Sequence, residues 1–163
     1  MATENKNLSD HDYNSIPKAT GWRFGIVVSE WNEEITEGLY EGAVEALLAC
    51  GVSESDIERF DVPGSFELVH GAKLVSDHKT VDAIICLGSV IRGETAHFDY
   101  VCSAVAQGIK DLNVQLSIPV IFGVLTDDHI DQSRARSGGK HGNKGAEAGV
   151  TAVKMVALKR QLS

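Results

Sequence analysis

Four short strand-like segments, each followed by a segment of helical periodicity, constrain the fold of this chain more than any other feature. They span residues 23–29, 56–62, 82–89 and 119–126. The first is a β-branched apolar run typical of a buried parallel strand, and the third is the most apolar of the four. Helices are predicted over 33–50, 65–78, 95–115, 128–137 and 144–161. Alternating strands and helices imply right-handed crossovers. We therefore predict an α/β fold, a single doubly wound domain with a four-stranded parallel sheet, flavodoxin-like, with helices on both faces.

The first twenty residues differ from the rest of the chain. They are polar, contain Ile16 and Pro17 near their end, and show neither strand nor helix periodicity. We predict a flexible N-terminal arm over residues 1–20 and one compact domain over 21–163, a length that suffices for a real core.

Composition excludes several classes of protein. The net charge of −8 and the pI of about 5.2 argue against a nucleic-acid binder, which needs a basic face. No apolar run approaches the ~20 residues of a membrane span, and the N-terminus lacks a signal pattern, so we expect a cytoplasmic protein. Cys50, Cys86 and Cys102 lie in apolar patterns and are expected to be buried and reduced. No Cys/His cluster has the spacing of metal ligands, and no metal is expected.

Ligands of open parallel sheets bind beyond the carboxyl ends of the strands, so the loops after the four strands form the candidate site. The first loop contains Trp31, which is either an exposed interface residue or a platform on which a planar heterocycle stacks. In the second, Pro63 and Gly64 form a turn. Ser65 then either caps the next helix or lets the N–H groups of residues 65–67 contact a ligand.

The third loop, in the segment "GSVIRGETAHFDYVC" (88–102), has the features of an anion site. Gly93 permits close backbone approach, and the N–H groups of Glu94 and Thr95 lie at a helix start, where the dipole favours negative charge. The same dipole favours a neutral imidazole at His97, which suits general acid–base catalysis. The plainer alternatives are a Thr95 helix cap and an ordinary surface histidine.

Basic residues follow the fourth strand. Lys144 opens the last helix behind an Asn143 cap, where a cation is disfavoured by roughly 0.3–1 kcal/mol, and Glu147 offsets this as an i,i+3 pair. A ligand would explain this lysine, although a solvated side chain is the plainer alternative. Arg134 and Arg136 are candidate phosphate ligands, because a guanidinium binds such oxygens bidentately.

Several common signatures are missing. The sequence has no GxGxxG, GxSxG or HExxH motif, and "GSFELVHGAK" lacks the Gly-Lys-Ser/Thr ending of a P-loop. The missing motifs therefore argue against dinucleotide redox chemistry, serine hydrolysis and nucleotide hydrolysis. The residues alone predict a doubly wound domain with an anion site beside a histidine.

Five segments, taken together, resemble the 6,7-dimethyl-8-ribityllumazine synthase family of riboflavin biosynthesis. They are "FGIVVSEWNEEIT", "VPGSFEL", "LGSVIRGETAHFDYV", "PVIFGVLT" and "GGKHGNKGAEA", in the family's order and spacing across about residues 22–162. The resemblance implies a transferase that condenses 5-amino-6-(D-ribitylamino)uracil with 3,4-dihydroxy-2-butanone 4-phosphate and releases phosphate. This is the penultimate step of the pathway, and it needs no cofactor.

The resemblance also implies a role for each matching position. His97 matches the proton-transfer residue, and phosphate binding falls to Glu94, Thr95 and Arg136. The substrate-binding positions that surround the uracil and ribityl groups are Trp31, Ser65, Phe66, Glu67, Ser89, Val90, Ile91, Phe122, Lys144 and Glu147.

In this family the active site lies between subunits, with the side of Phe122, Arg136 and Lys144 facing the other loops of the next subunit. The resemblance therefore implies two small-molecule substrates and self-association as a pentamer. The short "GGKHGN" link is similar to that of members that form an icosahedral shell of twelve pentamers. Riboflavin synthase is a further expected partner, whereas nucleic acid and membrane are not.

Trp31 departs from this pattern, and residues 1–20 lie outside the resemblance. Many members carry phenylalanine where this chain has Trp31, and some members with tryptophan hold flavin. A non-catalytic flavin or lumazine carrier, or a structural shell protein, is therefore the alternative to the enzyme. The resemblance assigns no role to Arg92, for which an ion pair between subunits is one interpretation.

Overall fold

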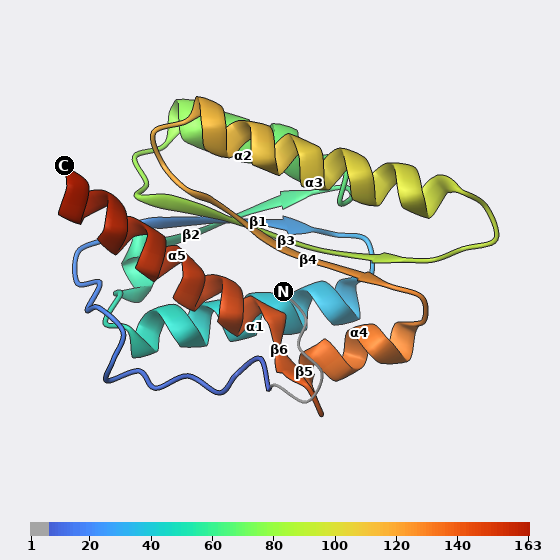
Figure 1. Ribbon diagram of the computed structural model, residues 1–163, viewed down its shortest axis with the longest axis horizontal. Coiled ribbons are helices and arrows are strands. Elements are labelled where there is room, and N and C mark those ends of the chain that lie inside the picture. Colours follow the sequence, from blue (N-terminus) through green and yellow to red (C-terminus); the bar gives the residue numbers. More distant parts are fainter. Residues whose placement is uncertain (1–6) are drawn as a thin grey trace.

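The computed structural model describes residues 7–163, which form a central sheet between two layers of helices (Figure 1). The strands are β1 (Phe24–Ser29), β2 (Ile57–Val62), β3 (Ala83–Ile91) and β4 (Val120–Asp127). They are parallel and lie in the order β2-β1-β3-β4. One register row across the sheet joins Phe60, Val27, Cys86 and Phe122. The predicted four-stranded parallel sheet is confirmed.

The helices cover both faces of this sheet, as predicted. They are α1 (Glu33–Ala49), α2 (Leu68–His78), α3 (His97–Gln115), α4 (Ile130–Arg136) and α5 (Lys144–Leu162), with a short 3-10 turn η1 (Glu54–Asp56). Figure 1 shows α2 and α3 on one face and α1 and α5 on the other. Within residues 7–163, none of these helices combines the length and apolar character that a membrane crossing needs.

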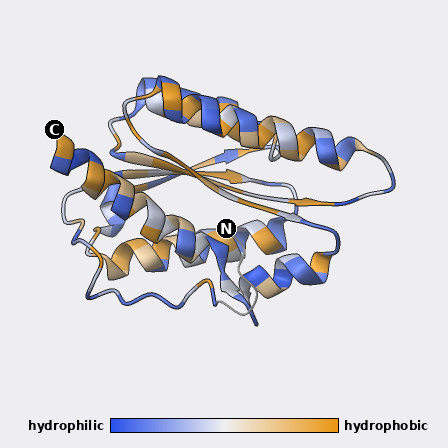
Figure 2. Ribbon diagram, viewed as in Figure 1, coloured by the Kyte–Doolittle hydropathy of each residue, from blue (hydrophilic) through white to orange (hydrophobic). Residues whose placement is uncertain are grey.

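Two buried apolar clusters hold the layers together. Along β1, Ile26 and Val28 belong to the cluster shared with α1 and α5, whereas Val27 belongs to the cluster shared with α2 and α3. Because both faces of the sheet are covered, the central strands β1 and β3 are almost entirely apolar, whereas the edge strand β2 carries Glu58, Arg59 and Asp61. Figure 2 shows the hydrophobic residues concentrated along the strands and the helix faces toward them.

The cysteines partly follow the prediction. All three are free, and Cys50 and Cys86 are buried, whereas Cys102 is only half-buried. Burial raises the pKa of Cys86 to about 12, so its thiol is protonated at neutral pH and does not act as a nucleophile.

Two helix starts and one loop differ from the sequence-based expectations. Ser65 does not cap α2: residues 64–67 form a turn, in which the N–H of Leu68 donates to the carbonyl of Ser65, and the helix begins only at Leu68. The first residue of α3 is His97 and its N-cap is Ala96, so Thr95, the predicted cap, lies one residue before the observed N-cap. The glycine-rich segment forms an unpredicted hairpin, β5 (Ser137–Gly139) and β6 (Gly142–Asn143).

The described part of the N-terminal segment packs on the domain. The N–H of Leu8 donates to the carbonyl of His141, and the N–H of Asn143 donates to the hydroxyl of Ser9. Ile16 and Ala19 are buried in the cluster formed with α1 and α5. Residues 1–6 of the predicted flexible arm lie outside the described residues, and the flexibility of the arm stays a prediction.

Candidate active site

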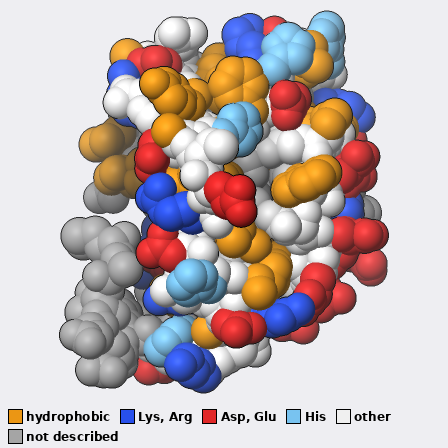
Figure 3. All heavy atoms as spheres, turned by 90° about the vertical axis from the view of Figure 1, so that its right-hand side faces the viewer, with side chains coloured by type: hydrophobic (Ala, Val, Ile, Leu, Met, Phe, Trp, Pro, Cys, Tyr) orange, Lys and Arg blue, Asp and Glu red, His pale blue; other side chains and the backbone are white. Residues whose placement is uncertain are grey.

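The candidate site lies at the carboxyl ends of the strands, where strand order reverses between β1 and β3. In open α/β sheets a crevice forms at such a point, bordered by the loops that leave the two strands. Figure 3 shows this end of the molecule, where hydrophobic and histidine side chains lie among acidic and basic ones. The loops after all four strands contribute to it.

The loop after β1 is held by Asn32 and presents Trp31 to solvent. Asn32 has a left-handed backbone with φ of 63°, and its side-chain amide donates to the carbonyl of Ser89 at 2.9 Å. This hydrogen bond joins the loop to β3 across the reversal point. Trp31 is 72% exposed, so it is available as a stacking surface rather than committed to the core.

The turn after β2 places one hydroxyl in an unusual environment. Ser65 is buried, and among the described residues its Oγ has no hydrogen-bond partner. A Cβ at Gly88 would lie 2.6 Å from this oxygen, so a glycine at that position leaves room for the serine. The neighbouring Phe66 is 58% exposed, and with Glu67 it lines a cavity of about 460 Å³ between α2 and α3.

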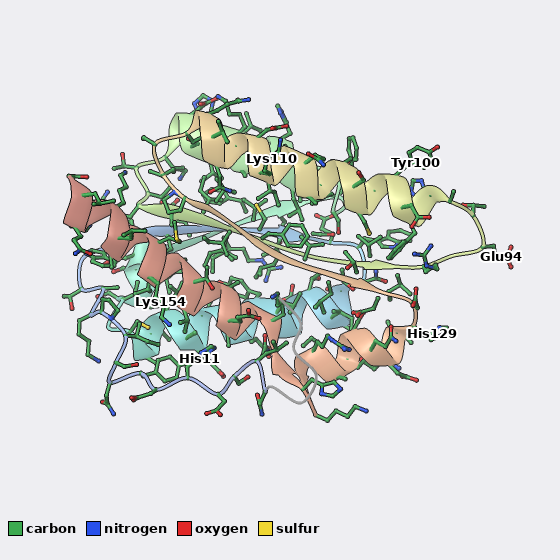
Figure 4. All side chains as sticks on the ribbon, viewed as in Figure 1. His11, Glu94, Tyr100, Lys110, His129 and Lys154 are labelled. Carbon is green, nitrogen blue, oxygen red and sulfur yellow. The ribbon has the colours of Figure 1, made fainter. Side chains whose placement is uncertain are left out.

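The loop after β3 carries the predicted anion site. Ser89 is buried and Val90 and Ile91 are half-buried, whereas Glu94, Thr95 and His97 are exposed. Figure 4 shows Glu94 at the tip of the loop, well beyond the end of the sheet.

The backbone of this loop is open to a ligand. Within residues 7–163, the N–H groups of Glu94 and Thr95 donate no hydrogen bond, and that of His97 reaches only the Thr95 hydroxyl at 3.4 Å. Glu94 and Thr95 precede the N-cap Ala96, and unsatisfied N–H groups just before a long helix are suited to an anion.

Arg92 is paired within its own chain, and the interpretation of an ion pair between subunits stays a prediction. Its guanidinium donates to both carboxylate oxygens of Asp99, at 3.3 and 3.1 Å, and to Asp128 at 2.8 Å. These hydrogen bonds, first those to Asp99 and then that to Asp128, raise the pKa of Arg92. The guanidinium also lies over the ring of Phe98, 4.1 Å from its centre.

The two candidate arginines of α4 differ in how many of their guanidinium donors already form hydrogen bonds. Arg134 donates to both oxygens of Glu34, at 2.8 and 2.9 Å, and to Asp131. Arg136 donates to the carbonyl of Gln132 at 2.9 Å and lies 4.0 Å from Asp127, so most of its donors remain free. Of the two, Arg136 is therefore the one available for a phosphate.

A buried hydroxyl network supports the loop that leads to Arg136. Ser133 donates to Asp127 at 2.8 Å, and Ser89 lies within hydrogen-bond distance of Ser133 at 3.4 Å. Both serines are almost fully buried. The network joins the ends of β3 and β4 to α4.

Phe122, Lys144 and Glu147 form a second group, beside β4. They line a cavity of about 340 Å³, in which Lys144 pairs with Glu147 at 2.8 Å. Asn143 caps α5 by accepting from the N–H of Gly145, so the predicted cap and the predicted i,i+3 pair are both confirmed. This cavity shares no residue with the cavity lined by Phe66 and Glu67. One chain therefore does not bring all the sequence-predicted site residues into one cavity.

Sequence reasoning missed the residues whose hydrogen bonds hold the loops of the candidate site. These are Asn32, Asp99, Asp127, Asp128 and Ser133. The acidic pair Asp127–Asp128 directly follows the predicted fourth strand, at a position where polar residues merit attention, and this signal could have identified it. Among residues 7–163, no three His, Cys, Asp or Glu side chains cluster as metal ligands would.

Comparison with known proteins identifies the family. The sequence model of 6,7-dimethyl-8-ribityllumazine synthase matches residues 21–160. The 6,7-dimethyl-8-ribityllumazine synthase of Flavobacterium johnsoniae is 62% identical over 100% of this chain and 86% of its own length. Those of Christiangramia forsetii and Porphyromonas gingivalis are 62% and 52% identical, each over 98% of this chain and over 96% and 99% of their own lengths. With a match across nearly the whole domain, the chain belongs to the 6,7-dimethyl-8-ribityllumazine synthase family.

Proposed function

We propose that this chain is an enzyme that condenses 5-amino-6-(D-ribitylamino)uracil with 3,4-dihydroxy-2-butanone 4-phosphate to form 6,7-dimethyl-8-ribityllumazine. Its relatives are lumazine synthases over the full length of the domain. The observation that carries the proposal is the exposed turn of Glu94 and Thr95, whose free N–H groups lie next to His97 at the start of α3. The reaction requires a site that binds the phosphate of the substrate and a group that transfers protons.

The phosphate is bound by backbone and guanidinium groups in this proposal. The N–H groups of Glu94 and Thr95 donate to the phosphate, helped by the dipole of the 19-residue α3. The Glu94 carboxylate would repel the anion, and its position at the tip of the loop allows it to point away. Arg136 supplies the counter charge through its uncommitted donors.

The uracil substrate is bound by the loops after β1, β2 and β3. Trp31 stacks on the planar ring, and the buried Ser65 hydroxyl donates to or accepts from its polar edge. Phe66, Glu67 and the chain from Ser89 to Ile91 surround the ring and the ribityl group. His97 moves the protons of imine formation, phosphate loss and ring closure.

The complete site is formed between two copies of the chain. Phe122, Lys144 and Glu147 lie in a cavity beside the edge strand β4, apart from the crevice between β1 and β3. We infer that this side, together with Arg136, faces the crevice of the next copy and that five copies close into a ring. An icosahedral shell of such pentamers and contact with riboflavin synthase are further proposed associations. A single chain then lacks part of the uracil site.

The decisive experiment mixes the purified protein with both substrates and follows the absorbance of the lumazine. A rate well above that of the uncatalysed condensation is the expected result. The exposed Trp31 also supports the alternative, a carrier of flavin or lumazine. No acceleration, together with riboflavin binding that Trp31→Phe abolishes, would replace the enzyme by the carrier.

A further inference from the structure

Arg92 lies at the base of the turn that contains Glu94 and Thr95, and its backbone continues the sheet. Its N–H donates to the carbonyl of Asp127 at 3.0 Å, one residue beyond the last paired position of β3. The main chain then leaves the sheet and returns to it only through α3. The turn of residues 93–96 therefore depends on what its two ends contact.

The turn itself has little to hold it in place. A Cβ at Gly93 would meet nothing within 4 Å, and all of residues 93–97 are exposed. The first buried residue after the turn is Phe98. Packing therefore cannot define where the N–H groups of Glu94 and Thr95 point.

The side chain of Arg92 supplies the missing constraint. It bridges Asp99, in the first turn of α3, and Asp128, in the loop between β4 and α4, while its guanidinium stacks on Phe98. The bidentate bond to Asp99 closes the chain from residue 92 to residue 99 into a loop. The bond to Asp128 attaches this loop to β4, because Asp128 directly follows that strand.

Three of the five N–H donors of Arg92 are used in these bonds, and two carboxylates face its single charge. Such a guanidinium is poorly suited to be a phosphate ligand. We propose that Arg92 is a positioning residue that fixes the phosphate-binding turn through Asp99 and Asp128. The proposal rests on the proposed function and adds to it a residue that the substrate does not touch.

Because the three side chains are exposed, their loss should change phosphate binding without changing the stability of the protein. Arg92 is 42% exposed, and Asp99 and Asp128 are 60% and 59% exposed. Exposed ion pairs contribute little to the free energy of unfolding, so losing them should leave the melting temperature nearly unchanged. A displaced turn, by contrast, should weaken phosphate binding strongly.

The first test compares Arg92→Gln with Arg160→Gln. Arg160 is the matched control, because it also pairs with an aspartate, Asp82, and stacks on an aromatic ring, Trp22. We expect Arg92→Gln to raise KM for the phosphate substrate by about 10-fold, with KM for the uracil substrate within about twofold and the melting temperature unchanged. Equal changes in both KM values, or the same change in Arg160→Gln, would overturn the proposal.

The second test distinguishes positioning from direct binding. In Asp99→Asn/Asp128→Asn, a positioning arginine loses its anchors, so KM for the phosphate substrate should rise as in Arg92→Gln. Adding Arg92→Gln to this double variant should then change nothing further. If Arg92 instead bound the phosphate, releasing it from both carboxylates would lower KM, and the proposal would fail.

A third readout does not depend on turnover. Inorganic phosphate, titrated into the protein and followed by phosphorus NMR, should bind more weakly to Arg92→Gln than to the wild type. A wild type that binds phosphate without forming lumazine would remove the proposed function alone, while the difference between the variants would still support the role of Arg92. Equal phosphate binding by both proteins would overturn the positioning role.

Discussion

His97 is the residue to which the proposed chemistry assigns a proton. It is the first residue of α3, exposed, and its N–H approaches the Thr95 hydroxyl. We predict that His97→Ala lowers kcat by about 10-fold or more, since general acid–base groups contribute typically ~10²–10⁴. Steady-state kinetics with both substrates measures this effect.

The matched control for this variant is His78→Ala. His78 ends α2 and precedes β3, so it lies at the opposite end of the sheet from the site. Its kcat should equal that of the wild type. A normal kcat in His97→Ala would show that proximity alone accelerates the reaction and that the imidazole transfers no proton.

Arg136 and Arg134 are two residues apart but should behave differently. We predict that Arg136→Ala raises KM for the phosphate substrate by at least about 10-fold, because charge-assisted bonds to phosphate contribute roughly 1.5–3 kcal/mol. Arg134→Ala should leave that KM unchanged, because its guanidinium is occupied by Glu34. Initial rates at varied phosphate substrate test both variants, and an equal rise in the two KM values would contradict the assignment.

At the scale of elements, α1 and α5 approach each other through glycines. A Cβ at Gly145 would lie 1.8 Å from the carbonyl oxygen of Leu39, and one at Gly149 would lie 2.9 Å from that of Ala43. Asn143 adds a hydrogen bond from its side chain to the carbonyl of Gly38 at 2.7 Å. The start of α5, and with it Lys144, is therefore positioned directly by the backbone of α1.

This contact predicts whether Gly145→Ala stabilises or destabilises the protein. Alanine is preferred over glycine inside a helix by about 1 kcal/mol, so propensity alone would make Gly145→Ala stabilising. Overpacking against a backbone atom costs about 1–3 kcal/mol or more, and at 1.8 Å it should dominate. We expect a lower melting temperature by calorimetry, whereas Gly93→Ala, with open space around it, should melt like the wild type. A more stable Gly145→Ala protein would show that the two helices separate freely.

At the scale of the whole molecule, large hydrophobic side chains are exposed on two different sides. One set lies on α2, α3 and the turn before α2, and comprises Phe66, Leu74, Tyr100 and Val114. The other lies on β4 and α5, and comprises Phe122, Met155, Leu158 and Leu162. Two different apolar surfaces allow one surface of each copy to bind the other surface of the next copy. Such head-to-tail contacts form a closed ring when the rotation between neighbouring copies divides a full turn evenly.

The mass of the assembly in solution tests the proposed pentamer. Native mass measurement or analytical ultracentrifugation should give five chains of 17.5 kDa, or a multiple of that unit if pentamers form a shell. Dilution that dissociates the ring should abolish turnover, because each crevice then loses the Phe122 and Lys144 side of its neighbour. A fully active monomer would contradict the shared site.

Much of the architecture could be predicted from the sequence, because it depends on local patterns. Strand-like segments and helical periodicity predicted the four strands of the parallel sheet and the five α-helices, but not the β5–β6 hairpin. The Asn143 cap and the Lys144–Glu147 pair follow from spacings of a few residues. The start of α2 was predicted too early, because Ser65 looks like a cap. Its hydroxyl instead lies beside Gly88, a neighbour that only the folded sheet provides.

By itself, the sequence determined the layered α/β fold, the position of the candidate anion site at the end of β3 and, by resemblance, the family. Only the tertiary structure decided which carboxylates Arg92 contacts and which arginine of α4 keeps most of its donors free. The reason is physical: Arg92 and Asp128 are 36 residues apart, and Arg134 and Glu34 are 100 residues apart. No local periodicity reports on pairs of that separation, because the fold of the whole sheet brings them together.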